Sequence, residues 1–322
     1  MQISHGAPKP NSSIGSRPRR RFKEPRYLST TNKEGVQEMS ASDSAHCDQP
    51  DPADIDRYLS EDVGSGDLTA NILPQSARAV ATVVTREKMV LCGKNWFSAI
   101  FHRLDPSVQI HWFSEDGDEI QAGDKICTVT GNARALMTGE RTALNLLQTL
   151  SATATLARSY ARAVADCNVK VLDTRKTIPG LRQAQKYAVR CGGCHNHRIG
   201  LYDAILIKEN HILAAGSIAL AVRQAQALNA CVMIEVEVET LEELKEALQA
   251  GATRILLDEF SVQMIRDAVS ITAGQAELEV SGNVSLETIR EIAETGVDYI
   301  SIGALTKNIR ALDLSMRVLL DE

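Results

Sequence analysis

Short apolar runs alternate with helix-like segments through the second half of the chain. The segments between most runs have helical periodicity and close with a glycine, as residues 241–251 and 286–296 do. Strand–helix repetition predicts a parallel sheet, and runs that are apolar on both faces are typical of a sheet covered by helices. Because six such units fill the available length, we expect a small α/β barrel and not the eight-stranded form. The runs are residues 169–173, 204–208, 232–237, 254–258, 278–282 and 299–303.

The pattern before residue 166 is different. Residues 79–131 alternate as β structure does, with glycine–acid turns between the runs. One amphipathic helix is expected at residues 95–104, and residues 133–165 have a strongly helical spacing. We therefore predict a first domain at residues 51–165, beginning with a helix near Ala53, and a barrel at residues 166–304.

Residues 1–50 are rich in Ser, Pro, Asn and Arg and cannot bury enough apolar area to offset their ordering entropy. We interpret them as a disordered polar and basic tail, with Met39 as an alternative start. Two other interpretations stay open: an organelle transit peptide, which Glu24 and Glu34 disfavour, and an arm that binds nucleic acid.

Charge and cysteine content narrow the class of protein. The formal net charge is −6, and because residues 1–50 carry 8 basic against 5 acidic side chains, the remainder carries −9. The net negative charge of the chain after residue 50 argues against nucleic acid as the main partner. No apolar run approaches the roughly 20 residues that span a bilayer, and no hydrophobic signal core is present, so we expect no membrane association. The 7 scattered cysteines indicate reduced thiols in a cytoplasmic protein.

Charged and small residues follow the apolar runs, and ligand groups of α/β barrels lie at the carboxyl ends of the strands. Several cations there predict a ligand with several negative charges, and the carboxylates suit a metal ion or sugar hydroxyls. Backbone N–H groups of the two last, glycine-containing ends suit a phosphate. The residues are Arg175, Lys176, His197, Arg198 and Lys208 (basic), Glu237 and Asp258 (acidic), and Ser281, Gly282, Asn283, Gly303 and Ala304 (small or polar).

These residues lie in longer motifs that resemble the quinolinate phosphoribosyltransferase family. The motifs are E-D-V-G-S-G-D-L-T from Glu61, G-E-R-T-A-L-N from Gly139, D-T-R-K-T-I-P-G-L-R from Asp173, N-H-R-I-G-L from Asn196, and L-I-K-E-N-H from Leu206. The resemblance extends from about Ala53 to the C-terminus. It implies an α/β fold of the type II phosphoribosyltransferase kind: an N-terminal α/β sandwich at residues 51–165, a six-stranded α/β barrel at residues 166–304, and a C-terminal helix at residues 305–322 that returns to the N-terminal domain. It also implies a homodimer whose subunits complete each other's active sites.

The resemblance further implies an activity: transfer of a phosphoribosyl group from phosphoribosyl pyrophosphate to quinolinate with decarboxylation, as in NAD biosynthesis, with Mg²⁺. The quinolinate carboxylates would contact Arg175, His197, Arg198 and Lys208, together with Arg141 contributed by the partner subunit. The diphosphate would contact Lys176 and Lys208, and the ribose and Mg²⁺ would contact Glu237 and Asp258. The 5′-phosphate would contact Ser281, Gly282, Gly303 and Ala304, and Asn283 would also bind substrate. Lys176, Lys208, Glu237 and Asp258 would be catalytic.

Two departures and two alternatives remain. Cys194 stands where the family has a glycine run, and Thr149 where relatives more often carry an arginine. The first alternative is a related phosphoribosyltransferase-like protein that acts on a different acid. The second is a non-catalytic haem- or metal-binding module that uses C-G-G-C-H at residues 191–195. Because Arg175 and the H-N-H-R run suit a dicarboxylate, we favour quinolinate.

Overall fold

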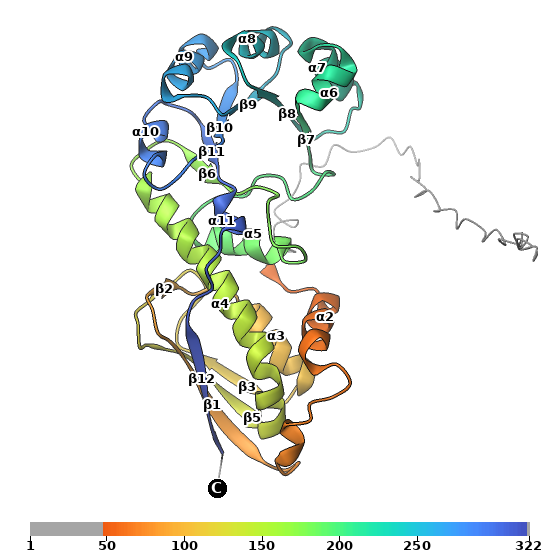
Figure 1. Ribbon diagram of the computed structural model, residues 1–322, viewed down its shortest axis with the longest axis vertical. Helices are drawn as coiled ribbons and strands as arrows, with labels where there is room; N and C mark the ends of the chain where they lie inside the picture. Colours follow the sequence, from red (N-terminus) through yellow and green to blue (C-terminus); the bar gives the residue numbers. More distant parts are fainter. Residues whose placement is uncertain (1–47, 321–322) are drawn as a thin grey trace, which may run out of the picture. The chain divides into compact units, whose positions relative to one another are not determined.

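The computed structural model describes residues 48–320, which form one antiparallel and one parallel sheet, each with its own apolar core (Figure 1). The six parallel strands and the antiparallel sheet before them confirm the predicted α/β class. The tail interpretation for residues 1–50 falls almost entirely on residues 1–47, outside the described residues. Among residues 48–320, no helix is long and apolar enough to cross a membrane.

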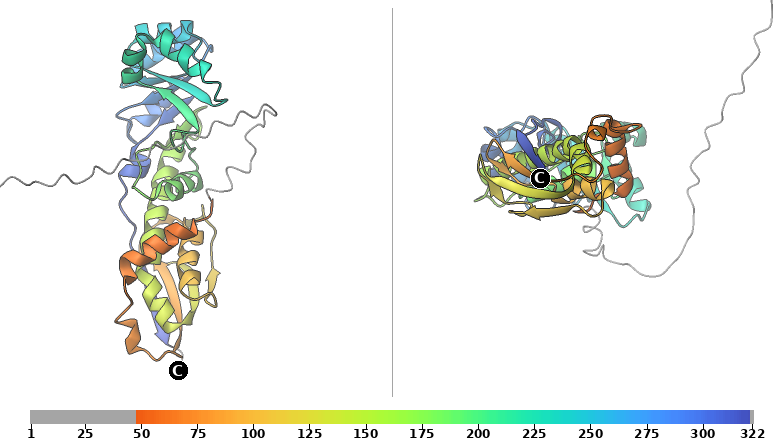
Figure 2. Two further views of the ribbon diagram at one scale, coloured as in Figure 1. Left: turned by 90° about the vertical axis from the view of Figure 1, so that its right-hand side faces the viewer. Right: turned by 90° about the horizontal axis from the view of Figure 1, so that it is seen from below.

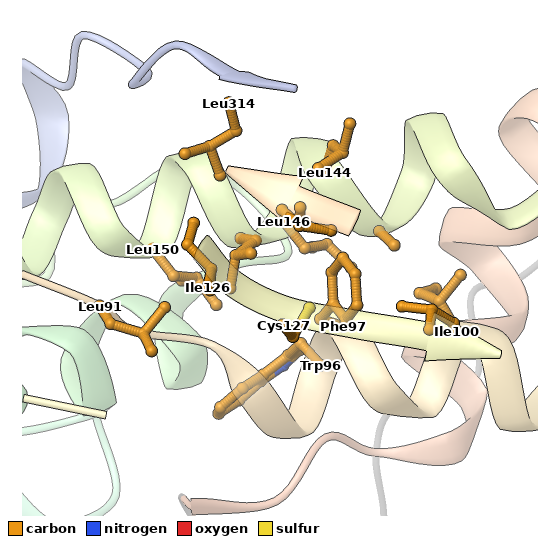
Figure 3. Close-up of a cluster of buried hydrophobic side chains, with 14 of the residues drawn as sticks. Leu91, Trp96, Phe97, Ile100, Ile126, Cys127, Leu144, Leu146, Leu150 and Leu314 are labelled. Atoms are coloured by element: carbon orange, nitrogen blue, oxygen red, sulfur yellow. The ribbon is translucent and has the colours of Figure 1, made fainter. Parts of the chain in front are cut away.

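The antiparallel sheet has the strand order β12-β1-β5-β3. Alternate residues of β1 are buried, as expected of a strand with one face on a core. Helices α2, α3 and α4 pack together beside this sheet, and Figure 2 shows them from two further sides. The core between them includes Phe97, Ile100 and Ile126 (Figure 3). The elements are α2 (Pro52–Val63), η2 (Ala70–Ile72), β1 (Arg78–Thr85), α3 (Lys94–Leu104), β3 (Gln109–Trp112), β5 (Lys125–Asn132), α4 (Ala133–Ala163) and β12 (Leu314–Leu320), with β2 (Met89–Val90) pairing separately with β4 (Glu119–Ile120).

Helix α4 contributes to both cores. Asn132 caps it by accepting hydrogen bonds from the backbone of Arg134 and Ala135, and the helix then runs for 31 residues. Its first part, up to Ala154, packs in the core of the antiparallel sheet, whereas Ala157 and Tyr160 pack in the core of the parallel sheet. The two sheets are therefore joined through one continuous helix.

The parallel sheet has the strand order β6-β11-β10-β9-β8-β7, and helices α6 to α9 lie along its outer side (Figure 1). Thr240 and Ser261 cap α8 and α9 with their hydroxyls, so both helices begin directly after their strands. The strands are β6 (Lys170–Leu172), β7 (Ala204–Ile207), β8 (Met233–Val238), β9 (Arg254–Asp258), β10 (Glu277–Ser281) and β11 (Tyr299–Ser301). The helices are α5 (Arg182–Cys191), α6 (Glu209–Ala215), α7 (Ile218–Ala227), α8 (Leu241–Gln249), α9 (Val262–Thr272), α10 (Ile289–Ala293) and α11 (Ala304–Lys307).

The outer edge of β6 carries a short extra segment around His195. The backbone N–H of His195 donates to the carbonyl oxygen of Val171 (2.8 Å), and the N–H of Asp173 donates to the carbonyl oxygen of His195 (3.0 Å). This bridge is parallel, like the sheet itself. It brings the residues that follow His195 to the carboxyl end of β6.

The expected C-terminal helix at residues 305–322 is wrong. Helix α11 ends at Lys307, and Leu314–Leu320 form β12, which pairs antiparallel with β1 from Thr85 to Ala79. Leu314 is buried and Met316 and Val318 pack on the same core, which is the two-residue period of a strand. A strand here also satisfies the hydrogen-bonding groups at an edge of β1 that would otherwise lack partners.

Candidate active site

The carboxyl ends of the parallel strands surround a pocket of about 150 Å³. The residues that line it come from β7 to β11 and from the segments that follow β6 and His195, so residues far apart in sequence meet there. The lining residues are Thr174, Arg175, Lys176, His197, Arg198, Leu206, Lys208, Glu237, Leu256, Glu279, Ser281 and Ser301.

All five basic residues singled out in the sequence line this pocket. Arg198 is held by a hydrogen bond from Nη1 to the carbonyl oxygen of Ala204 (3.1 Å). Burial lowers the pKa of Arg198, and the nearby Arg175 lowers it further, because two guanidinium groups repel each other. Because guanidinium groups are not deprotonated in proteins, the two arginines concentrate positive charge that suits an anionic ligand.

Glu237 at the end of β8 is the acidic counterpart. It is 8% exposed and forms an ion pair with Lys208 of the neighbouring strand end. Burial raises the pKa of Glu237, Lys208 opposes that rise, and the carboxylate of Asp258 adds to it. Asp258 ends the adjacent strand β9 and lies outside the set of residues that line the pocket.

A second hollow of about 210 Å³ adjoins the first and shares Thr174, Lys176, Ser281 and Ser301 with it. The predicted small residues Gly282, Asn283, Gly303 and Ala304 line it. Gly282 has a φ of +95°, and an added Cβ would lie 3.1 Å from the backbone nitrogen of Glu259, so a larger residue would be strained there. Lys307 also lines this hollow and was not singled out from the sequence.

A charged cluster that sequence reasoning missed lies beneath the pocket, inside the parallel sheet. Arg254 donates from Nη2 to Glu279 (2.6 Å) and from Nε to Glu235 (3.3 Å), and both carboxylates are fully buried. His197 Nε2 lies 3.0 Å from Glu235 and 3.4 Å from Glu279. The available signal was an acidic or basic residue inside an otherwise apolar run, as in I-E-V, L-E-V and R-I-L-L.

The cluster determines the charge of His197. With both carboxylates ionised and a neutral histidine ring, the cluster would have a net charge of −1, whereas a protonated ring makes the cluster neutral. The backbone N–H of Arg198 lies 2.7 Å from Nδ1, a contact suited to the neutral ring. A neutral hydrogen bond contributes about 1 kcal/mol, whereas an uncompensated buried charge costs several, so the protonated ring is favoured. Burial lowers the pKa of His197, but Glu235 and Glu279 outweigh it and raise that pKa to about 9.

Arg141 is placed apart from this pocket. It projects from α4 with 59% of its side chain exposed and lines a separate hollow of about 370 Å³, together with Glu61, Asn145 and Thr149. Within the described residues, the predicted basic group and Glu237 thus meet in one pocket, and Arg141 does not join them. Thr149, one of the two departures from the family pattern, lines the same hollow as Arg141.

The C-G-G-C-H segment does not form a metal site. Cys194 is buried with its Sγ 3.2 Å from the carbonyl oxygen of Ala157, and His195 bridges to β6. Within residues 48–320, the group of at least three ligand-type side chains close enough to share an ion is His197, Glu235 and Glu279. Arg254 and the protonated His197 together neutralise the two carboxylates, so we assign no ion to them.

Comparison with known proteins identifies the family. Residues 67–151 match the profile of the quinolinate phosphoribosyl transferase N-terminal domain, and residues 153–317 match that of the C-terminal domain. The probable nicotinate-nucleotide pyrophosphorylase [carboxylating] of Bacillus subtilis (strain 168) is 43% identical over 267 residues, which is 83% of this chain and 92% of that protein. The chloroplastic nicotinate-nucleotide pyrophosphorylase [carboxylating] of Arabidopsis thaliana is 38% identical over 311 residues, with 90% of this chain and 89% of that one covered.

Solved structures agree with the sequence comparison. The nicotinate-nucleotide pyrophosphorylase from Francisella tularensis superposes with a TM-score of 0.81 at 46% identity and covers 85% of this chain and 99% of its own. NadC from Streptococcus pyogenes gives a TM-score of 0.80 at 40% identity, with 83% and 96% covered. The chain belongs to the quinolinate phosphoribosyltransferase family.

Proposed function

We propose that the protein transfers the phosphoribosyl group of phosphoribosyl pyrophosphate to quinolinate and removes one carboxyl group, which yields nicotinate mononucleotide, pyrophosphate and CO₂. The observation that carries this proposal is the gathering of Arg175, His197, Arg198 and Lys208 around one pocket. Family membership supports the same reaction, because relatives at about 40% identity carry the name of this enzyme.

The basic group suits the two adjacent carboxylates of quinolinate. Guanidinium groups pair bidentately with a planar carboxylate, which an ammonium group cannot do, so Arg175 and Arg198 are the proposed clamps. The protonated His197 is already paired with Glu235 and Glu279, so the positive charge left for the ligand on this side comes mainly from the two arginines. A monocarboxylate would leave one of these two arginines without a carboxylate partner, which favours quinolinate over a related acid.

The adjoining hollow suits the phosphoribosyl donor. We assign the 5′-phosphate to the end of β10 and the segment after β11, where Ser281, Gly282, Asn283, Gly303 and Ala304 present a tightly turned backbone. Lys176 borders both hollows, so it is the proposed contact of the diphosphate together with Lys208. Lys307 adds a further positive charge on the phosphate side.

Glu237 and Asp258 are the proposed ligands of Mg²⁺ and of the ribose hydroxyls. They fit this role because they end adjacent paired strands and lie close enough for Asp258 to affect the pKa of Glu237. Carboxylate oxygens are the ligands that magnesium prefers. When bound, the ion would neutralise charge on the departing pyrophosphate.

The proposed chemistry needs positioning more than acid–base catalysis. The pyridine nitrogen of quinolinate attacks C1 of the ribose while the bond from C1 to the pyrophosphate oxygen breaks. Glu237 stabilises the oxocarbenium-like character that develops on the ribose, and Lys176 and Lys208 stabilise the leaving diphosphate. The new pyridinium nitrogen is cationic, so it stabilises the electron pair that stays on the adjacent C2 when the bond to CO₂ breaks, and C2 then takes a proton from solvent while the nitrogen remains cationic. Binding and desolvation of the carboxylate by the basic group promote that second step.

We also propose a homodimer in which Arg141 of one subunit completes the pocket of the other. This is supported by the 59% exposure of its side chain and by its place in a separate hollow, which leaves it free to contact another subunit. A cytoplasmic location is supported by the six cysteines of the described chain, which are all unpaired.

The direct test is to incubate the purified full chain with quinolinate, phosphoribosyl pyrophosphate and Mg²⁺ and to measure nicotinate mononucleotide and CO₂ release. A parallel reaction contains nicotinate in place of quinolinate. We expect product with quinolinate alone. Product with nicotinate at a comparable kcat/KM would contradict the dicarboxylate assignment and favour the alternative, a related phosphoribosyltransferase acting on another acid.

A further inference from the structure

A second buried ion pair lies behind the pocket wall and has no place in the reaction described above. Lys186 of α5 forms an ion pair with Asp173, which directly follows β6. The side chain of Lys186 is 1% exposed and that of Asp173 is 0% exposed. Neither side chain lines the pocket, so neither contacts a ligand there.

The pair holds both peptide groups of His197. The backbone N–H of His197 donates to Asp173 Oδ1 (2.9 Å), and Lys186 Nζ donates to the carbonyl oxygen of His197 (2.8 Å). Fixing the N–H and the C=O of one residue fixes its φ and ψ, and so determines where its ring and the following residue, Arg198, point. The ring is then directed at Glu235 and Glu279.

Asn196 adds a third connection. Its Nδ2 donates to Asp173 Oδ2 (2.6 Å) and to the backbone oxygen of Lys186 (2.9 Å). Its Oδ1 accepts from Arg190 Nη1 (2.8 Å), so every polar atom of the amide group has a partner. Asp173 therefore uses both carboxylate oxygens on the segment that carries His197 and Arg198.

The same aspartate begins the other basic segment. Asp173 is followed at once by Thr174, Arg175 and Lys176, which line the pocket. Both basic segments are thus anchored on one buried carboxylate, although they are separated by more than twenty residues of sequence. A displacement of Asp173 would change the spacing between Arg175 and Arg198, the two proposed clamps.

Stability alone does not account for this pair. Removing two charges from water costs several kcal/mol, and a buried ion pair is often no more stabilising than apolar side chains of the same volume. The two charges also cancel each other as seen from the pocket, so the pair adds little to its positive potential. What it does supply is geometry, since it joins three groups of Asn196 and His197 to the aspartate that directly precedes the other basic segment.

We propose that Asp173 and Lys186 are positioning residues that set the spacing of the two basic segments, and so determine affinity for a dicarboxylate. This proposal rests on the assignment of the pocket to quinolinate. The hydrogen bonds of the pair go to Asn196 and His197, on the acceptor side of the site. Most of the donor side lies on β10 and the segment after β11, and Lys176 is the donor contact closest in sequence to Asp173, so we expect binding of the acceptor to be affected more than binding of the donor.

The test compares Asp173→Asn, Lys186→Met and the double variant Asp173→Asn/Lys186→Met with the wild type. Each single change leaves a buried charge without its partner and should lower the unfolding midpoint. The double variant leaves none, so its midpoint should recover toward that of the wild type. We nevertheless expect its KM for quinolinate to rise at least tenfold, with a clearly smaller rise in KM for phosphoribosyl pyrophosphate.

Arg134→Met is the matched control. Arg134 of α4 is partly buried and donates to the carbonyl oxygen of Leu73 (2.9 Å) and to Asn71 Oδ1 (3.2 Å), and none of these three residues lines the pocket. This variant should lose stability without a change in KM for quinolinate. Asn196→Ala is a milder change that removes the third connection and keeps the ion pair. If the double variant does not fold, Asn196→Ala tests the proposal instead, again by whether KM for quinolinate rises.

Two results would overturn the proposal. One is a folded double variant, or Asn196→Ala, whose KM for quinolinate stays within twofold of the wild type. The other is a parallel rise of both KM values that follows the loss of stability across the series, Arg134→Met included. Calorimetric titration with quinolinate alone measures the affinity of each variant without turnover. A wild type that binds no quinolinate would contradict the proposed function itself, which separates the two failures.

Discussion

Replacement of Arg254 by methionine tests the buried cluster beneath the pocket most directly. Methionine roughly keeps the volume of the side chain and removes its charge. The change deletes the hydrogen bonds to Glu279 (2.6 Å) and Glu235 (3.3 Å) and the stacking of the guanidinium on Tyr299, whose ring centroid is 3.8 Å away. Both carboxylates are fully buried, so water cannot take the place of the lost cation.

Breaking a buried pair by removal of one partner costs about 3–5 kcal/mol, because the remaining charge is left uncompensated. A domain of ordinary stability has about 5–15 kcal/mol in total, so Arg254→Met should lose a large share of its free energy of unfolding. We expect the variant to unfold at a clearly lower urea concentration than the wild type in far-UV circular dichroism at pH 8.

The deficit should also depend on pH. Burial raises the pKa of Glu279, and His197 and Arg254 together outweigh burial and hold that pKa at about 2. Without Arg254, burial raises the pKa values of Glu235 and Glu279 above those of the unfolded chain. A group with a raised pKa in the folded state contributes stability at low pH and loses it as pH rises through that pKa. The difference between variant and wild type should therefore shrink from pH 8 to pH 5.5.

Arg290→Met is the control for this experiment. Arg290 pairs with Asp166 and Glu294 on the surface, where water screens the charges, so its loss should leave the unfolding midpoint close to that of the wild type. An Arg254→Met protein as stable as this control, or one whose deficit grows toward low pH, would refute the reasoning.

Three further predictions concern the pocket. Arg175→Ala and Arg198→Ala should each raise KM for quinolinate roughly 30-fold, since a charge-assisted contact contributes about 2 kcal/mol, and near-wild-type steady-state kinetics in both would contradict the clamp. Chelation of Mg²⁺ should abolish turnover, and Glu237→Gln should raise the Mg²⁺ concentration that gives the half-maximal rate; an unchanged Mg²⁺ titration curve would argue against Glu237 as a ligand. Glu235 and Glu279 outweigh burial and raise the pKa of His197 to about 9, so affinity for quinolinate should fall as pH rises through 9. Glu279→Gln should move that fall to lower pH. If the wild type and Glu279→Gln had the same profile of KM against pH, the charge of His197 would not be responsible.

The sequence was sufficient for the parallel sheet and for most of the pocket. Each strand run is short, apolar and closely followed by charged or small residues, and the carboxyl ends of parallel strands meet by necessity. For this reason the sequence alone assigns Arg175, Arg198, Lys208 and Glu237 to one site, and the four residues do line one pocket.

What the sequence concealed are interactions between distant segments. L-S-M-R-V-L-L at residues 314–320 satisfies a helical spacing about as well as an alternating one, and its partner β1 lies more than 200 residues earlier in the chain. Likewise, Glu235, Arg254 and Glu279 are three separate charges in three apolar runs, and only their adjacency on paired strands makes them one neutral cluster with His197. Nothing local distinguishes Lys186 from a surface lysine of an amphipathic helix.

The position of β12 has a consequence for biosynthesis. A ribosome makes β1 early but β12 only after the entire parallel sheet, so the antiparallel sheet is the first to be started and the last to be complete. Until then the edge of β1 lacks a partner, and the core lacks the side chains of Leu312 and Leu314. Nascent chains stalled before this point carry an open strand edge of the kind that promotes aggregation, even if the parallel sheet has already folded.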